Sequence, residues 1–353
     1  MTDKYKVAIV GAASLRGKEL NEVLSESPFA SAEFSLMDDE SQLGQLEAVG
    51  DEVTFIQRIE PSSFTHEDFV FFAGSAEATL KHWKSALKAG ASILDLSYAL
   101  EGEAGVLVRA PWVKEALRES LSESSSELES PDLSTPAIVP AHPVSVALGL
   151  LMARLRELGD VKSASATVLE PASEYGRQAM DELHQQTVGL LSFQTLPKAE
   201  YDTQVAFNVV PVLGEAAKIN LAASESRIRR HYDLLSAGAL PEVAIQLLHA
   251  PVFHGQSVSL AVELTEPVLP EHVEAALGTE HVDVVLGDAD APNNLSSAGQ
   301  GDVMVRVRPY NGEERECKRF WIWASLDNLK FSAMNGLACA MELRKLRPLG
   351  KVQ

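Results

Sequence analysis

The sequence predicts an α/β protein in which a doubly wound, Rossmann-like parallel sheet is followed by a second domain of α+β type. Over residues 5–96, short apolar runs alternate with amphipathic helical patterns. This alternation is typical of parallel strands that are covered by helices on both faces. From Lys162 onward, the strand-like segments instead alternate apolar and polar residues. Such a pattern indicates an antiparallel or mixed sheet with one covered face.

The elements of the first domain follow one another closely. The run Val7-Ala8-Ile9-Val10 reads as a buried strand, and Leu20, Val23 and Leu24 share one face of the helix after it. The predicted elements are strands at 5–10, 32–41, 69–73 and 93–96, and helices at 18–24 and about 76–89.

The second half has a different texture. A segment rich in Ser and Glu, residues 119–136, contains few apolar residues and ends in prolines, so we expect a flexible acidic loop there. The predicted strands that follow are 163–170, 256–264, 302–309 and 319–326, and the predicted helices are 224–248, 270–278 and 332–346.

Composition excludes several classes of function. The 353 residues are enough for roughly two domains. A formal net charge of -20 argues against nucleic acid or an anionic membrane as a partner. The longest apolar stretch, Val144–Met152, is too short to cross a bilayer, and no signal-peptide pattern opens the sequence, so we expect a cytoplasmic protein. The two cysteines, Cys317 and Cys339, lack the spacing of a zinc site.

The turn after the first strand is similar to a dinucleotide-binding turn without its middle glycine. It reads Gly11-x-x-Ser14-x-x-Gly17. In such turns, glycines let the backbone approach a pyrophosphate, which lies at the helix N-terminus. The Ser14 hydroxyl can bind a phosphate or cap the helix, and Arg16 can pair with a phosphate or face solvent. The turn therefore keeps the capacity to bind a cofactor.

The acidic end of the second predicted strand bears on the type of cofactor. The sequence there is Met37-Asp38-Asp39-Glu40. Acidic side chains repel the 2′-phosphate of NADP, whereas one of them can accept the ribose hydroxyls of NAD. A solvated acidic turn on the surface explains the same residues. If a dinucleotide binds, we expect NAD in preference to NADP.

Seven segments, in one order along nearly the whole chain, resemble the landmarks of the aspartate-semialdehyde dehydrogenase family, and most closely its USG-1-like branch. No single landmark is specific, but their combination is. The segments are "KVAIVGAASLRG", "GASILDLSYAL", "VPAHPVSVAL", "VLEPASEYGRQAMDELHQQT", "VAFNVVPVLG", "APVFHGQSVSLAVEL" and "DNLKFSAMNGLACAMEL".

The resemblance implies a particular reaction. In the family, a cysteine thiolate attacks the aldehyde carbon, hydride leaves to NADP, and phosphate releases the acyl-enzyme. A histidine acts as general base for the thiol. An arginine binds the substrate carboxylate in a two-pronged pair, and a glutamine beside the thiol orients the acyl group.

Aligned by motif, every one of these positions has changed. The nucleophile position holds His142, the general-base position Gln256, the arginine position His249 and the glutamine position Glu170. Glu174 replaces a glycine of the family motif, and Phe331 replaces its lysine. A glutamine cannot take up a proton at neutral pH, so the resemblance implies a family member that has lost thiol-based catalysis and binds a nucleotide or has a regulatory role.

Other roles for these residues remain open. His142 can be a histidine at a strand-to-helix turn that bonds only to backbone. It can also serve, with His249 and His254, an altered oxidoreductase chemistry on an aldehyde or acyl-phosphate substrate. The family activity itself, by another route, is a further alternative. A metal site formed by the three histidines and Glu170 is chemically conceivable, but the sequence does not show that they converge, and we expect no metal.

The resemblance also implies the domain plan. We expect a dinucleotide-binding-like domain at 1–140, completed by a C-terminal helix that returns to it at 328–353, and a dimerisation or substrate domain at 141–327. A homodimer and a small-molecule ligand are the expected partners. The candidate cofactor-binding residues are Gly11, Ala13, Ser14, Leu15, Arg16, Gly17, Asp38, Gly74, Ser75 and Asn328.

Overall fold

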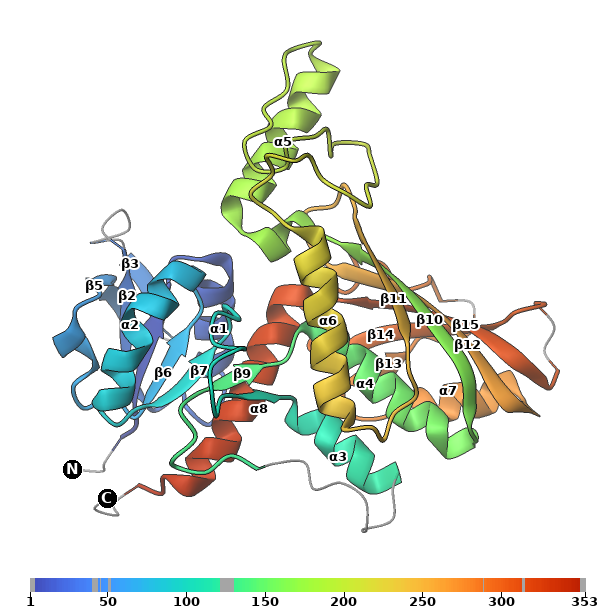
Figure 1. Ribbon diagram of the computed structural model, residues 1–353, viewed down its shortest axis with the longest axis horizontal. Coiled ribbons are helices and arrows are strands. Elements are labelled where there is room, and N and C mark those ends of the chain that lie inside the picture. The colour runs from blue at the N-terminus through green and yellow to red at the C-terminus, as the bar shows by residue number, and fades with distance from the viewer. Residues whose placement is uncertain are drawn as a thin grey trace. The chain divides into compact units, whose positions relative to one another are not determined.

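The computed structural model describes residues 4–39, 44, 46–49, 52–120, 130–287, 289–312 and 315–349, which pack as two compact units (Figure 1). The first comprises Met1–Pro111, Glu129–Ala141 and Ser332–Gln353, and the second comprises Trp112–Leu128 and His142–Phe331. Helix α8 (Asn328–Leu346) begins in the second unit and continues in the first. These units are defined by packing alone. The limits expected for the functional domains, 1–140 with 328–353 and then 141–327, therefore stay predictions.

The first unit is built on a parallel sheet, as predicted. Its strands lie in the order β5-β2-β1-β6-β7-β9-β8, and each neighbouring pair is parallel. Its strands are β1 (Lys6–Val10), β2 (Glu33–Asp38), β5 (Gln57–Arg58), β6 (Phe69–Phe72), β7 (Ser92–Asp95), β8 (Leu107–Arg109) and β9 (Ile138–Pro140); a separate hairpin joins β3 (Leu46–Val49) to β4 (Glu52–Phe55).

Helices cover both faces of this sheet. Val7 and Ile9 of β1 pack into a core that includes side chains of α1 (Leu15–Ser25) and α8. Ala8 and Val10 point to the opposite face and pack with side chains of α2 (Ala76–Lys88). Because successive side chains of a strand alternate between faces, one apolar run supplies both cores. This confirms the doubly wound arrangement.

Several predicted boundaries in these regions were wrong, among them the end of the strand predicted at 32–41, which ends at Asp38. Helix α1 begins at Leu15, three residues before the predicted start, because Ser14 caps it. Glu119 and Ser120 belong to α3 (Pro111–Ser120) and not to the expected acidic loop. Residues 121–129 of that loop lie outside the described residues, as does Glu40.

The second unit contains the predicted mixed sheet. Its strands lie in the order β11-β10-β12-β15-β14-β13, with parallel pairs β10–β11 and β13–β14 and antiparallel pairs elsewhere. Helix α6 packs against β11, and α4 packs against α6 and α7 (Figure 1). Its elements are α4 (Pro143–Leu155), β10 (Val161–Glu170), α5 (Arg177–Leu191), α6 (Leu221–Ser236), β11 (Ala244–His249), β12 (Gln256–Val268), α7 (Pro270–Leu277), β13 (Val282–Val284), β14 (Val303–Pro309) and β15 (Cys317–Leu326).

The predicted helix 224–248 is a helix followed by a strand. Helix α6 ends at Ser236 because Ala237 and Gly238 both have positive φ angles, 45° and 76°. Strand β11 then runs beside β10, and Ile245, Leu247 and His249 are its buried residues. Among the described helices, none combines the length and hydropathy needed to cross a bilayer.

Candidate functional site

The glycines of the first turn are required by close backbone contacts. Gly11 has a φ of 82°, and a Cβ on it would lie 2.2 Å from Gly74 Cα. A Cβ on Gly17 would lie 2.1 Å from Gly11 O. These three predicted residues therefore allow the end of β1, the end of β6 and the start of α1 to meet at the carboxyl edge of the parallel sheet, the edge where such folds bind ligands.

Ser14 replaces the missing glycine with two hydrogen bonds. Its Oγ accepts the N–H of Gly17 at 2.9 Å and donates to Ala73 O at 2.9 Å. The sequence left two roles open for this hydroxyl, phosphate binding and helix capping, and in the structure it caps α1. The predicted residue Ser75 plays the same role for α2, because its Oγ accepts the N–H of Ala78.

Two charged side chains lie beside this turn. Asp38 ends β2, and its Oδ2 accepts the N–H of the predicted residue Ala13 at 2.8 Å. Burial raises the pKa of the Asp38 carboxyl, although the N–H groups that it accepts oppose the shift. Arg16 is half-buried and lies over the Tyr98 ring, 5.1 Å from its centroid. It is therefore not a purely solvent-facing arginine. Leu15, also half-buried, begins α1.

A polar row crosses the end of the mixed sheet in the second unit. On one side of β10, Glu170 pairs with His249 of β11. On the other side, Leu169 pairs with Ser257 of β12, so the next residues along the two antiparallel strands, Glu170 and Gln256, lie beside each other. All three side chains are 0% exposed. Two rows of apolar side chains precede them on the same buried face of the sheet. The first row is Ala166, Ile245 and Leu260, and the second is Val168, Leu247 and Val258. Sheet pairing therefore brings together three positions that the sequence singled out.

His142 caps the N-terminus of α4 and is held from two sides. Its Nδ1 accepts the N–H of Val144 at 3.3 Å, and its own N–H donates to His231 Nδ1 at 3.0 Å. Pro143 favours an extended backbone at residue 142 and fits the first turn of the helix. Because Nδ1 acts as an acceptor, a neutral ring carries its proton on Nε2.

The Nε2 atom of His142 faces two carboxylates. It lies 3.8 Å from Glu170 Oε1 and 3.7 Å from Glu174 Oε1. The second oxygen of each carboxylate is held by a donor. Tyr175 Oη donates to Glu170 Oε2 at 2.8 Å, and Asn328 Nδ2 donates to Glu174 Oε2 at 3.0 Å. Burial, reinforced by the Glu170 charge, raises the pKa of the Tyr175 hydroxyl well above its ordinary value, so it stays a donor.

His249 and Gln256 have a different character. Neither side chain has a hydrogen-bond partner among the described residues, although all four polar atoms are buried. Burial lowers the pKa of His249 to about 4, so its imidazole is neutral near pH 7. The His249 ring lies 4.8 Å from that of Tyr201. A neutral imidazole at the family's arginine position cannot form a charged pair with a carboxylate.

Some predicted residues lie elsewhere. Asn328, a candidate cofactor-binding residue, uses its side chain inside the second unit, where Oδ1 accepts from Ser173 Oγ and from the N–H of Gly255. Within the described residues, the group at coordinating distance is His142, Glu170 and Glu174; His249 and His254 are not members of it. Phe331 is buried against Trp112. Sequence reasoning missed Tyr175, although it lies in the quoted segment 168–187, and His231, which lies in none of the quoted segments.

Comparison with known proteins now identifies the fold. Residues 6–120 match the NAD binding domain of semialdehyde dehydrogenase, and residues 152–331 match its dimerisation domain. The chain belongs to the semialdehyde dehydrogenase family. It is 30% identical to a USG-1 protein homolog of Azotobacter vinelandii over 98% of this chain and 99% of that protein. Its place in the USG-1-like branch, expected from the sequence, is thus confirmed.

Two further members of the semialdehyde dehydrogenase family are similar over the full length. An aspartate-semialdehyde dehydrogenase of Rickettsia bellii is 24% identical over 98% of this chain and 99% of that protein. The solved structure of a probable aspartate-semialdehyde dehydrogenase from Pseudomonas aeruginosa is 26% identical, with a TM-score of 0.81 over 98% of this chain and 100% of that one. Both expected domains of this family are therefore present in this chain.

Proposed function

We propose that this member of the semialdehyde dehydrogenase family has lost thiol-based catalysis and acts as a nucleotide-binding or regulatory protein. The observation that carries the proposal is the state of His142 at the position aligned with the nucleophile. The lone pair at Nδ1 is taken by the N–H of Val144, and the nitrogen facing the site, Nε2, carries the proton in the neutral ring. A protonated nitrogen cannot attack a carbonyl carbon.

Neither cysteine can replace the thiol. Cys317 pairs with Val268 at one end of the β12–β15 ladder, whereas Gln256 pairs with Leu326 at the other. Leu326 lies nine residues after Cys317 in β15, which is roughly 30 Å along the strand at about 3.3 Å per residue. Cys339 is 0% exposed in the core of the first unit, and burial raises the pKa of its thiol. A thiolate at the site is therefore not available from this chain.

The other family positions support the same conclusion. Gln256 cannot serve as general base, and the neutral His249 cannot hold a substrate carboxylate as an arginine does. Glu170 and Glu174 add negative charge where the family substrate, a carboxylate that reacts with phosphate, must bind. Such a site repels that substrate pair.

Nucleotide binding is proposed for the first unit, with NAD preferred over NADP. The glycine contacts of the turn are intact, and Asp38 is held at the end of β2 by Ala13 N–H, the place from which an acidic side chain reaches a ribose hydroxyl. Fluorescence titration with NADH and NADPH tests the preference. Equal or tighter binding of NADPH would contradict it.

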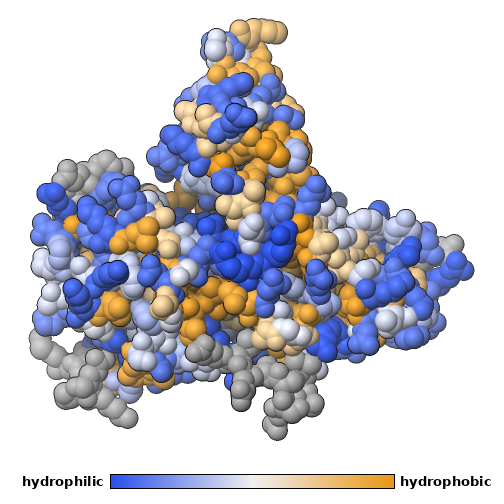
Figure 2. Space-filling view, in the orientation of Figure 1, coloured by the Kyte–Doolittle hydropathy of each residue, from blue (hydrophilic) through white to orange (hydrophobic). Residues whose placement is uncertain are grey.

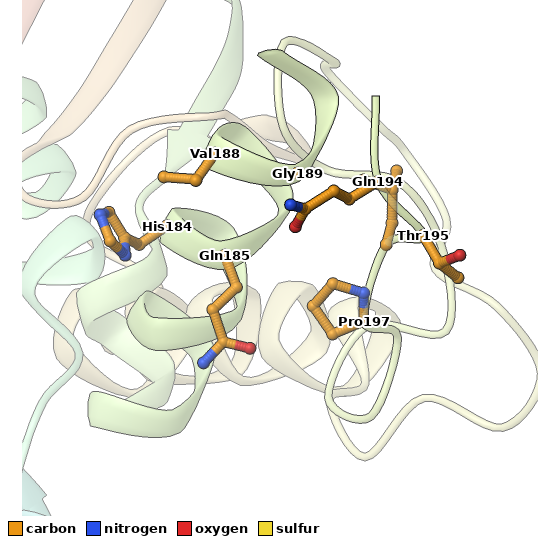
Figure 3. A pocket seen from close by; sticks show the side chains of 8 residues that line it. His184, Gln185, Val188, Gly189, Gln194, Thr195 and Pro197 are labelled. Carbon is orange, nitrogen blue, oxygen red and sulfur yellow. The ribbon is translucent and has the colours of Figure 1, made fainter. Parts of the chain in front are cut away.

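A homodimer is also proposed, through the apolar surface of the second unit. Leu191, Phe193, Phe207 and Val212 are 66–99% exposed, and Figure 2 shows apolar residues gathered over the segment built by α5 and the chain after it. A pocket of about 530 Å³ lies in this segment, between α5 and residues 194–197 (Figure 3). Contiguous apolar surface of this kind marks interaction sites.

The proposed loss of catalysis is tested with phosphate-dependent oxidation of aspartate semialdehyde, with NAD and NADP in parallel. We expect no reduced cofactor above a control without protein. The double variant His142→Cys, Gln256→His restores a thiol and a base, and any turnover that it gains shows that the pocket persists. His281→Cys, which places a thiol outside the site, is the matched control.

One observation favours an alternative, an NAD(P)-dependent enzyme with altered chemistry on an aldehyde or acyl-phosphate substrate. His142 Nε2 lies 3.8 Å from Glu170 Oε1 and 3.7 Å from Glu174 Oε1. A carboxylate can therefore exchange a proton with the ring once one of these pairs closes to hydrogen-bonding distance or is bridged by a water. Turnover by the wild-type protein that disappears in His142→Ala would support this alternative and refute the loss of catalysis.

A further inference from the structure

Two carboxylates and one imidazole converge at the position of the family's nucleophile. The donor atoms of His142, Glu170 and Glu174 all lie within 4.8 Å of one another. Their side chains are 1%, 0% and 6% exposed. Donor atoms that share a tetrahedral zinc ion lie about 3.4 Å apart when each bond is about 2.0–2.1 Å long. The 3.7 and 3.8 Å distances from His142 Nε2 need a contraction of a few tenths of an ångström. The two carboxylate oxygens, which lie within 4.8 Å of each other, need to approach by up to about 1.4 Å.

Both carboxylates are oriented by hydrogen bonds in a way that suits coordination. Tyr175 Oη and Asn328 Nδ2 each hold the Oε2 atom of one glutamate, so both Oε1 atoms are turned toward His142. Asn328 is itself fixed, because its Oδ1 accepts from Ser173 Oγ and Gly255 N–H. Ligands that are anchored from behind by further hydrogen bonds are characteristic of protein metal sites.

We propose that His142, Glu170 and Glu174 bind a divalent metal ion, with Zn²⁺ as the ion that best fits the donor set. One imidazole and two carboxylates suit Zn²⁺, which accepts three protein ligands and an open fourth position. The two carboxylate charges balance the charge of the ion in this buried site. The metal site rests on the proposed function in one respect: the position of the family's nucleophile holds His142 and not a cysteine thiolate.

Metal binding changes the histidine tautomer. Coordination through Nε2 requires the lone pair there, so the ring proton moves to Nδ1 and the 3.3 Å hydrogen bond from Val144 N–H is given up. One long hydrogen bond is a small loss compared with the bonds of an ion to two carboxylates and an imidazole. The Val144 amide therefore reports on occupancy independently of any enzymatic activity.

His281 offers a control in which one imidazole also lies near two carboxylates, those of Glu280 and Asp302. Its Nε2 lies 3.9 Å from Glu280 Oε1, and its Nδ1 lies 3.8 Å from Asp302 Oδ1. The two carboxylates approach opposite nitrogens of the ring, so one ion cannot be shared by all three groups. Glu280 and Asp302 are also 85% and 53% exposed.

The test is calorimetric titration of chelator-treated full-length protein with Zn²⁺, together with the absorption spectrum of the Co²⁺-loaded protein. We expect one ion per chain, with an affinity at least about 100-fold lower in Glu174→Gln and unchanged in Glu280→Gln. Glu174→Gln retains the shape of the side chain, and circular dichroism checks its fold. In the wild type, the Val144 amide resonance should shift on loading.

Each outcome separates this proposal from the proposed function. No Zn²⁺ binding by the wild type, or equal binding by Glu174→Gln, would overturn the metal site and leave the loss of thiol catalysis standing. Semialdehyde oxidation by the chelator-treated protein would overturn the loss of catalysis and leave the metal site to be judged by titration. Equal weakening by Glu280→Gln would mean surface binding only and would also overturn the metal site.

Discussion

Gly11→Ala would place a methyl group where two backbone segments of the first unit touch. A Cβ at residue 11 would lie 2.2 Å from Gly74 Cα and 2.3 Å from Gly74 N. Backbone atoms cannot rotate away as the end of a long side chain can. The ends of β1 and β6 would therefore have to separate, and the turn that is proposed to hold a nucleotide would deform.

The loss of stability expected in Gly11→Ala has two causes, and a second variant separates them. The positive φ of 82° at Gly11 costs an alanine about 1–2 kcal/mol, and the overpacking adds about 1–3 kcal/mol. The expected loss in free energy of unfolding is therefore about 2–5 kcal/mol. Gly90 has a φ of 90° and nothing within 4 Å of an added Cβ, so Gly90→Ala should lose only the first part.

Urea unfolding of the wild type and both variants, followed by tryptophan fluorescence and circular dichroism, measures the two losses. Gly11→Ala should be less stable than Gly90→Ala by at least about 1 kcal/mol. The same proteins can be titrated with NADH, and we expect weaker binding only for Gly11→Ala. Equal stability of the two variants would refute the tight approach of residues 11 and 74.

Three further predictions concern charge and assembly. Burial lowers the pKa of His249 from 6.5 to about 4, so between these pH values the unfolded chain binds a proton that the folded chain does not, and the free energy of unfolding falls as the pH falls. In urea titrations over this pH range, His249→Leu should remove roughly 3 kcal/mol of that fall. An unchanged dependence of stability on pH would contradict the buried neutral ring. Asp38→Ser should raise the affinity for NADPH relative to NADH about tenfold in fluorescence titrations, which an unchanged ratio would argue against. Phe193→Asp should weaken the proposed homodimer at least about tenfold by sedimentation, whereas the similarly exposed control Leu295→Asp should not.

The fold was predictable from the sequence where local pattern decides it. The apolar run of β1 and the helical spacing of α1 identify both elements without reference to the rest of the chain. Strand β11 was missed because Leu247 and Leu248 extend the apolar pattern of the preceding helix. Only pairing with β10, which is distant in sequence, makes this segment a strand.

The candidate site was predictable as a set of positions but not as a geometry. Motif order located His142, Glu170, His249 and Gln256 separately. That three of them share one row depends on strand register, which is set by apolar residues elsewhere in the sheet. The bond between Asn328 and Glu174 joins residues 154 positions apart. No local pattern encodes such a contact, so the histidine cluster considered from the sequence included the wrong residues.

The polar row at the end of the mixed sheet also has a consequence for exchange kinetics. Its residues are enclosed and belong to strands, not to a loop that can swing aside. We expect that a water enclosed in this row leaves when the ends of β10, β11 and β12 open together. Its residence time is therefore coupled to local unfolding of the sheet, and amide hydrogen exchange at Glu170 and His249 should keep pace with its release.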